Sequence, residues 1–464
     1  MKIKCLFFLA CLLSLQLNLN AQAVAKQLKI DKRIRSFIVY KPTNYTEGMP
    51  LVLNLHGFTL NGSAQMSYTN FNRFADSVGC MVVYPSGIQK RWGAGTFMGV
   101  ENKIDDVSFL GQLIDYMAIN YAIDLKKVYS IGYSAGGFMS YRLACDLSGR
   151  IAAISPVASS MTQEVYSDCN PSRRIPILSI HGTGDPVVSF YGIPGQFPSN
   201  RKVVEFWTKN NLCDPIVVED TLPNIAVNDH SRVTRTVYPS CGNNAPFISY
   251  KIIYGGHTWP GSNPFGILGN TNQDIKANSV IWDFLSQYSI PQQMICDKPT
   301  NLLSNINDCI ATLTWNEIVG TTGYRISIID NTAKEVKIYE SNSNSFIFPT
   351  ITDHNYSWAV AANCEGNFFN LAIGTPFNAC GLGLTNRKTF EKSIVLFPNP
   401  ANDKLYFESD EIMNNEMVQI VDIVGRKVKD YICKEGQNII SIEDLEKGMY
   451  FLQTKMGGIE FVKQ

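Results

Sequence analysis

The chain has 464 residues, which is too long for one ordinary domain and predicts two to four. Its 40 lysine and arginine residues balance 40 aspartate and glutamate residues, so the formal net charge is zero. Because the chain has no basic block, nothing in it suggests nucleic acid or an anionic membrane surface as a partner, and we expect a soluble globular protein.

A signal peptide is predicted at residues 1–23. Met1–Lys4 is basic, Cys5–Leu17 is an apolar core too short to span a bilayer comfortably, and Ala21–Ala23 is an A-x-A cleavage site. Cys11 faintly resembles a lipoprotein cysteine, but the apolar run continues past it. No later run reaches transmembrane length, so we expect an exported protein with no transmembrane segment.

Residues 24–290 are predicted to form an α/β domain, because short apolar runs alternate with amphipathic helices. That pattern is typical of a mostly parallel sheet covered on both faces. Helices are predicted to begin at Asp105-Asp106, whose carboxylates suit a helix N-terminus, and to span Asp274–Tyr288. The predicted strands are Phe37–Tyr40, Leu51–Leu55, Met81–Tyr84, Val128–Ile131, Ile175–Ile180 and Ile248–Tyr254.

The segment Gly132–Gly136 reads Gly-Tyr-Ser-Ala-Gly and lies between a predicted strand and the helical pattern of Gly137–Cys145. Strand, G-x-S-x-G and helix together are the context of the nucleophile elbow of an α/β-hydrolase. The serine of such an elbow sits on a strained turn, which requires small neighbours. We therefore predict that Ser134 is a catalytic nucleophile.

A serine nucleophile needs a histidine that accepts its proton and a carboxylate that orients the histidine. His257 lies on a glycine-rich loop just past a predicted strand, where the base of this fold belongs; a satisfied loop histidine is the alternative. Asp185 follows a predicted strand and falls between Ser134 and His257 in the chain, although a turn-forming aspartate is the alternative. Asp214 is the second candidate for the acid.

The other histidines receive no catalytic role. His56 and His181 each end a strand before a glycine and are interpreted as structural hydrogen-bonding residues, whereas His230 and His354 look incidental. The histidines are scattered, and the chain has no H-E-x-x-H or C-x-x-C motif. We therefore expect neither a metal nor another cofactor.

The oxyanion of a tetrahedral intermediate needs two backbone N–H donors. Ala135, which follows the nucleophile, is predicted to supply one. Phe58, in the loop that Gly57 lets approach the serine, is predicted to supply the other, with Thr59 as the alternative. The predicted substrate pocket contains Trp259, Thr59 and Tyr133, although packing within the loop is an equal alternative for Trp259.

The composition and the hydrophobic pattern of the chain change near Ile290-Pro291. Alternating stretches between turns rich in threonine, serine and asparagine predict a small antiparallel β-sandwich over residues 295–380. A linker rich in glycine and charge spans residues 381–392, and residues 393–464 are predicted to form a last β unit.

Twelve cysteines are present, and Cys5 and Cys11 leave with the signal peptide. The other ten enter an oxidising compartment, so some are expected to pair. Cys213 and Cys241 are the best predicted pair. Buried free thiols are expected at Cys80 and Cys433. Two disulfides of unassigned connectivity are predicted among Cys296, Cys309, Cys364 and Cys380.

Six motifs occur together in residues 30–288: Leu55-His56-Gly57, Tyr84-Pro85-Ser86-Gly87, Asp105-Asp106-Val107, Gly132–Gly137, His181–Asp185 and the His-Thr-Trp-Pro-Gly stretch of Gly256–Gly261. With these motifs, the segment resembles the secreted esterase family that includes polyhydroxybutyrate depolymerases, feruloyl esterases and acetyl xylan esterases. This resemblance implies that Ser134 is the nucleophile, Asp185 the orienting acid and His257 the base, with a Cys213–Cys241 disulfide near the histidine loop.

The two C-terminal units carry resemblances of their own. Residues 296–380, with Trp315 and Tyr324, resemble a fibronectin type III domain. Leu396–Ala401, Val421–Arg426 and Gly448–Phe451 are similar to the C-terminal sorting domain of the type IX secretion system of Bacteroidota. That similarity implies the type IX secretion machinery as a partner and an extracellular or cell-surface location.

These observations predict a secreted serine carboxylesterase. Feruloyl or acetyl esters of plant polysaccharides are favoured as substrates over a polyester such as polyhydroxybutyrate, and acyl transfer to an alcohol remains open. The alternative of another class is a non-catalytic surface-binding protein that uses the β modules.

Overall fold

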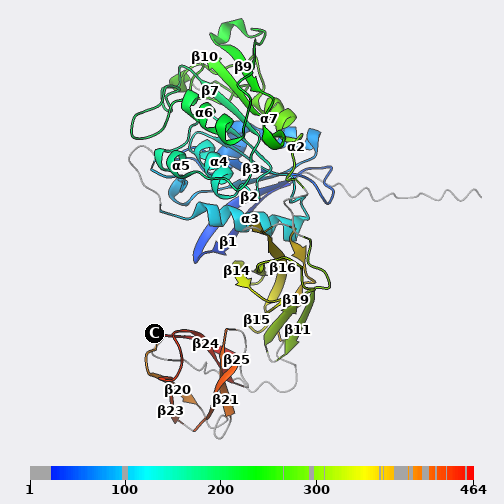
Figure 1. Cartoon of the computed structure of the whole chain (residues 1–464), viewed down its shortest axis with the longest axis vertical. Coiled ribbons are helices and arrows are strands. Elements are labelled where there is room, and N and C mark those ends of the chain that lie inside the picture. The colour runs from blue at the N-terminus through cyan, green and yellow to red at the C-terminus, as the bar shows by residue number, and fades with distance from the viewer. Residues whose placement is uncertain are drawn as a thin grey trace, which may run out of the picture.

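The computed structural model has an α/β domain followed by two all-β units, which confirms the predicted fold class (Figure 1). The first strand begins at Gln22, and the predicted signal peptide up to residue 21 lies outside the described residues, as does the predicted linker 381–392. None of the described helices is long and apolar enough to cross a membrane. The structure describes residues 22–96, 103–264, 266–291, 297–307, 309–364, 367–368, 370–380, 396, 401–409, 417–423, 426–434, 436–454 and 457–464.

One sheet organises the α/β domain, with the strand order β1-β2-β4-β3-β5-β6-β7-β10-β9-β8. The six strands from β4 to β10 in this order run parallel, and antiparallel strands flank them on both sides. The strands are β1 (Gln22–Ile30), β2 (Arg33–Lys41), β3 (Leu51–Leu55), β4 (Met81–Pro85), β5 (Val128–Tyr133), β6 (Ala153–Val157), β7 (Ile177–Gly182), β8 (Val218–Thr221), β9 (Arg232–Tyr238) and β10 (Phe247–Ile253).

Both faces of this sheet are buried. Because alternate strand residues point in opposite directions, each strand contributes side chains to two cores. In β3, Leu51 and Leu53 belong to one apolar core and Val52 to the other. The first core packs against α3 (Asp106–Tyr121), α4 (Ala135–Asp146), α5 (Gln163–Asp168) and α6 (Asn200–Asn210). The second packs against α1 (Gly62–Thr69), α2 (Phe71–Val78) and α7 (Ala277–Leu285). Single 3₁₀ turns lie at η1 (Ile88–Lys90), η2 (Val227–Asp229), η3 (Gly242–Asn244) and η4 (Gly266–Leu268).

The second unit is a β-sandwich around a core that contains Trp315, Tyr324 and Trp358. A disulfide joins Cys309 to Cys380 and Cys364 is also disulfide-bonded, whereas Cys296 lies outside the described residues. One sheet holds β11 (Leu303–Asn307), β12 (Ile310–Thr314) and β15 (Ser345–Pro349); the other holds β13 (Tyr324–Asp330), β14 (Glu335–Ser341), β16 (Asn355–Cys364) and the short β17 (Asn367–Phe368), β18 (Ala372–Ile373) and β19 (Phe377–Asn378).

The last unit pairs two small antiparallel sheets around a core that includes Phe407 and Leu452. Cys433 is buried in that core. Its strands are β20 (Lys404–Ser409), β21 (Met417–Asp422), β22 (Lys427–Ile432), β23 (Gly436–Ser441), β24 (Gly448–Thr454) and β25 (Gly457–Lys463).

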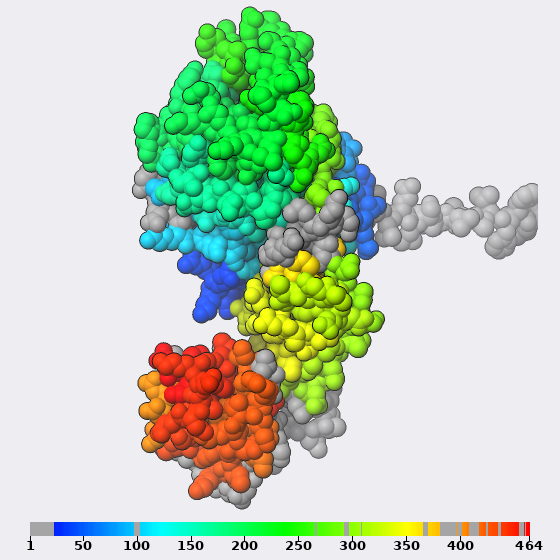
Figure 2. All heavy atoms as spheres, in the orientation of Figure 1, coloured from blue at the N-terminus to red at the C-terminus, as the bar shows by residue number. Residues whose placement is uncertain are grey.

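The sandwich packs directly against helix α3 of the α/β domain (Figures 1 and 2). The buried carboxylate of Asp115 accepts hydrogen bonds from Arg150 at 2.6 Å and from Ser327 at 2.8 Å, and pairs with Arg325 at 2.8 Å. Burial alone would raise the pKa of Asp115, but the two arginines outweigh burial and lower it. Strand β14 also pairs with β1, so the first two units share one continuous sheet.

Candidate active site

Ser134 lies on the sharp turn between β5 and α4, with φ 54° and ψ −122°. At the two glycines that flank this turn, Gly132 and Gly136, the surrounding backbone leaves no room for a side chain. A Cβ on Gly132 would lie 2.2 Å from the backbone of Gly136, and a Cβ on Gly136 would lie 2.1 Å from the carbonyl oxygen of Leu55. The N–H of Ser134 donates to Val157 at 2.9 Å, which anchors the turn to β6. The local geometry is therefore that of a nucleophile elbow.

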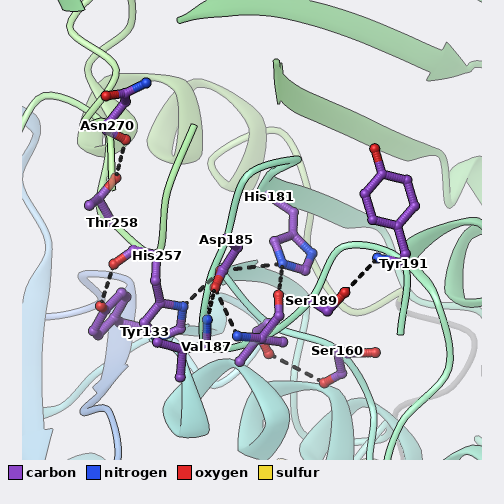
Figure 3. A network of polar contacts seen from close by, with 12 residues as sticks. Tyr133, Ser160, His181, Asp185, Val187, Ser189, Tyr191, His257, Thr258 and Asn270 are labelled. Atoms are coloured by element: carbon purple, nitrogen blue, oxygen red, sulfur yellow. Dashed lines mark hydrogen bonds and ion pairs between the residues drawn. The ribbon is translucent and has the colours of Figure 1, made fainter. Parts of the chain in front are cut away.

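Asp185 and His257 are 72 residues apart in sequence and form a buried pair, with Nδ1 of the imidazole 2.7 Å from Oδ2 of the carboxylate (Figure 3). The other carboxylate oxygen accepts the N–H groups of Val187 and Val188, each at 2.8 Å. Burial alone would raise the pKa of Asp185, but hydrogen bonds from His181 and His257 outweigh it and lower the pKa to about 2. The carboxylate is therefore ionised and fixed in orientation.

His181 faces the same carboxylate from the other side (Figure 3). Its Nε2 lies 2.8 Å from the carbonyl oxygen of Val188 and 3.5 Å from Oδ2 of Asp185. Since a carbonyl can only accept, Nε2 carries the proton. These contacts agree with the interpretation of His181 as a structural hydrogen-bonding residue.

Tyr133 connects the elbow to the histidine loop. Its hydroxyl donates to the carbonyl oxygen of His257 at 2.7 Å, and the two rings lie 5.0 Å apart (Figure 3). A Cβ on Gly57 would lie 3.0 Å from the Tyr133 ring and 3.4 Å from Cβ of Ser134. The loops after β3, β5 and β10 therefore meet at one edge of the sheet. The hydroxyl of Ser134 makes no hydrogen bond to any described residue. Proton transfer from this hydroxyl to Nε2 of His257 is therefore part of the proposal below.

Of the two predicted oxyanion donors, Ala135 directly follows Ser134, and Phe58 follows Gly57, on which a Cβ would lie 3.4 Å from Cβ of Ser134. Ala135 is the first residue of α4, where a backbone N–H has no carbonyl partner within the helix. The N–H of Thr59, the alternative donor, donates to the carbonyl oxygen of Lys90 at 3.1 Å.

The structure places the remaining predicted residues in different surroundings. Trp259 is buried in the core beside α7, and its indole N–H donates to Asn278 at 3.0 Å, so packing accounts for this side chain better than a pocket wall. Thr59 is exposed. Cys213 and Cys241 form a disulfide, and the neighbouring Asp214 is exposed. Within the described ranges no group of three or more histidine, cysteine, aspartate or glutamate residues is arranged to hold a metal ion.

Two further features were not predicted from the sequence. A disulfide joins Cys145, near the end of α4, to Cys169. Asp106 is fully buried beside Arg35 and accepts the N–H of Gly93 at 2.6 Å, whereas Asp105 caps α3 by accepting the N–H of Ser108. The buried partners of Asp106 lie far from it in sequence, so no local motif identifies them.

Comparison with known proteins agrees with the predicted resemblances. Residues 395–464 match the secretion system C-terminal sorting domain, which confirms the predicted sorting domain and the expected export. A bifunctional acetylxylan esterase/xylanase of Neocallimastix patriciarum is 29% identical over 256 residues, which are 55% of this chain and 34% of that protein. Feruloyl esterase B of Piromyces equi is 27% identical over 262 residues, which are 55% of this chain and 46% of that protein.

This chain therefore spans less than half the length of these two relatives. An acetyl xylan esterase from Aspergillus awamori aligns with a TM-score of 0.41 at 14% identity, covering 57% of this chain and 99% of that one. The likenesses to acetylxylan and feruloyl esterases confirm the resemblance predicted for residues 30–288. The resemblance to fibronectin type III domains and the polyhydroxybutyrate depolymerase alternative stay predictions.

Proposed function

We propose that the protein is a secreted serine carboxylesterase that works through an acyl-enzyme. The observation that carries this proposal is the buried 2.7 Å contact between Asp185 and His257, together with a sharp turn that has Ser134 at its apex. A carboxylate on Nδ1 leaves Nε2 of the imidazole as the proton acceptor. Ser134 then attacks the ester carbonyl while His257 takes its proton.

The negative charge that develops on the carbonyl oxygen is stabilised by the N–H groups of Phe58 and Ala135. His257 returns the proton to the leaving alcohol, and the acyl group stays on Ser134. Water then gives a proton to His257 as its oxygen bonds to the acyl carbon. The bond from that carbon to Oγ of Ser134 breaks, His257 returns the proton to Ser134, and the acid leaves. The ionised Asp185 stabilises the imidazolium that forms in each half of the reaction.

Esters of plant polysaccharides, feruloyl or acetyl, are the proposed substrates. The named activities of the two relatives support this class. The sorting domain at residues 395–464 supports delivery by the type IX secretion machinery, which would place the enzyme beside polymers that cannot enter a cell.

The decisive experiment compares the wild type with Ser134→Ala on a chromogenic short-chain ester. We expect the variant to lose at least about 10³-fold in kcat, because the nucleophile is gone while the fold remains. Equal rates for the two proteins would refute the enzymatic role and favour a surface-binding protein. Active wild-type enzyme is then offered methyl ferulate, acetylated xylan and polyhydroxybutyrate films. Release of acid from the film alone would replace the proposed substrate class with a polyester.

A further inference from the structure

His56 ends β3 next to the predicted oxyanion loop, and both of its ring nitrogens are engaged. Nε2 lies 2.9 Å from the backbone nitrogen of Gly87, and Nδ1 lies 2.8 Å from the carbonyl oxygen of Gly57. The backbone N–H can only donate and the carbonyl can only accept, so one neutral tautomer, protonated at Nδ1, satisfies both contacts. Burial lowers the pKa of His56 to about 4, which keeps this tautomer uncharged at neutral pH.

The ring itself is held in place. Its side chain is fully buried, the Trp92 ring lies 4.7 Å away, and the Trp92 indole N–H donates to the carbonyl oxygen of His56 at 2.8 Å. The orientation of His56 is therefore set by the loop between Gly87 and Trp92 rather than by solvent.

The carbonyl that His56 contacts belongs to the same peptide group as the N–H of Phe58. In a planar trans peptide these two groups point in opposite directions, so fixing the carbonyl also fixes the N–H. The Gly57 carbonyl accepts from Nδ1 of His56 and from the N–H of Leu60 at 3.1 Å. The same glycine approaches Cβ of Ser134, which brings this peptide to the nucleophile.

We propose that His56 is a positioning residue, whose Nδ1–H holds the Gly57–Phe58 peptide so that the Phe58 N–H faces the oxyanion of the tetrahedral intermediate. This inference rests on the proposed function. An oxyanion donor acts in the transition state more than in the ground state, so loss of its alignment lowers kcat and leaves KM nearly unchanged.

Two substitutions distinguish the role of the donor at Nδ1 from that of the acceptor at Nε2. His56→Asn keeps an N–H donor at the place of Nδ1 and loses the acceptor at Nε2, whereas His56→Gln keeps an acceptor at the place of Nε2 and loses the donor at Nδ1. Both replace the ring by one amide, and the two variants differ in size by a single methylene group. Rates are measured on a short-chain ester and expressed per active site, titrated with a fluorophosphonate, so that unfolded protein does not count.

We expect kcat of His56→Gln to fall about 10- to 100-fold, less than the 10²- to 10³-fold loss on removing an oxyanion donor outright. KM should change less than about threefold, and His56→Asn should keep kcat within about fivefold of the wild type. Equal losses in the two variants, or a larger loss in His56→Asn, would overturn the proposal. A merely structural role would shift the melting temperature of both variants without separating their kcat values.

The two hypotheses fail in different ways. If Ser134→Ala is as active as the wild type, the proposed function is wrong. If Ser134→Ala is inactive while His56→Asn and His56→Gln have the same kcat, only the role given to His56 is wrong.

Discussion

Replacing Asp185 with asparagine tests the orienting acid with little disturbance of the loop. An amide oxygen at the position of Oδ1 can still accept the N–H groups of Val187 and Val188, which leaves the amide NH₂ facing His257. That NH₂ can only donate, so Nδ1 loses its proton and Nε2 gains it. An imidazole in this tautomer cannot accept the proton of Ser134.

The magnitude follows from the tautomer. Hydrogen bonds from His181 and His257 outweigh burial and lower the pKa of Asp185 to about 2, so the native site holds a carboxylate where the variant holds a neutral amide. The wrong tautomer costs about 10⁴-fold in a serine protease. We therefore expect kcat of Asp185→Asn to fall by about 10⁴-fold, with KM nearly unchanged.

The assay is steady-state hydrolysis of a chromogenic ester, and Asp214→Asn is the matched control. Asp214 is the other aspartate that sequence order allows as the acid, but it is exposed. We expect this control to keep full activity. The reasoning would be refuted if Asp185→Asn retained more than about a tenth of the wild-type kcat, or if Asp214→Asn lost as much.

Two further predictions concern stability. Asp115→Asn should lower the free energy of unfolding in urea by about 3 kcal/mol, because it leaves two partly buried arginines without their buried counter-charge. Asp146→Asn, which removes a half-exposed ion pair on α4, should change it by less than about 0.5 kcal/mol, and equal effects would exclude a special role for the buried group. Removing both cysteines of the Cys145–Cys169 disulfide should cost about 3 kcal/mol in the same assay, and no loss would mean that this bond does not constrain the unfolded chain.

The central strands could be predicted because buried parallel strands are nearly continuous apolar runs. The predicted Leu51–Leu55 is β3, and Val128–Ile131 lies within β5. Strand β6 was not predicted, because Ser155 and Pro156 interrupt its apolar run. Both residues are nevertheless buried in the sheet. The edge strand β8 is mostly exposed, so it has no buried face to leave a pattern.

The candidate site divides in the same way. Chain order and strand ends were enough to select Asp185 and His257, because the carboxyl ends of parallel strands meet at one edge of a sheet. Contacts that depend on the folded loops could not be predicted from local patterns. The pocket role predicted for Tyr133 did not include the hydrogen bond that its hydroxyl donates to the backbone of the histidine loop. Only the folded chain brings those two segments together.

The two histidines at strand ends share a local pattern that predicts a structural hydrogen bond but not its partner. His56 and His181 each precede a glycine, and a Cβ on Gly182 would lie 2.3 Å from the carbonyl oxygen of Gly255. Each imidazole contacts a backbone carbonyl in the loop that follows its strand, at Gly57 and at Val188. In each pair the glycine permits a close approach, to the Tyr133 ring at Gly57 and to the Gly255 backbone at Gly182, and the histidine fixes the loop. One of these loops contains the candidate oxyanion donor and the other contains the candidate acid. A histidine outside the proposed triad can therefore still set the geometry on which the triad depends.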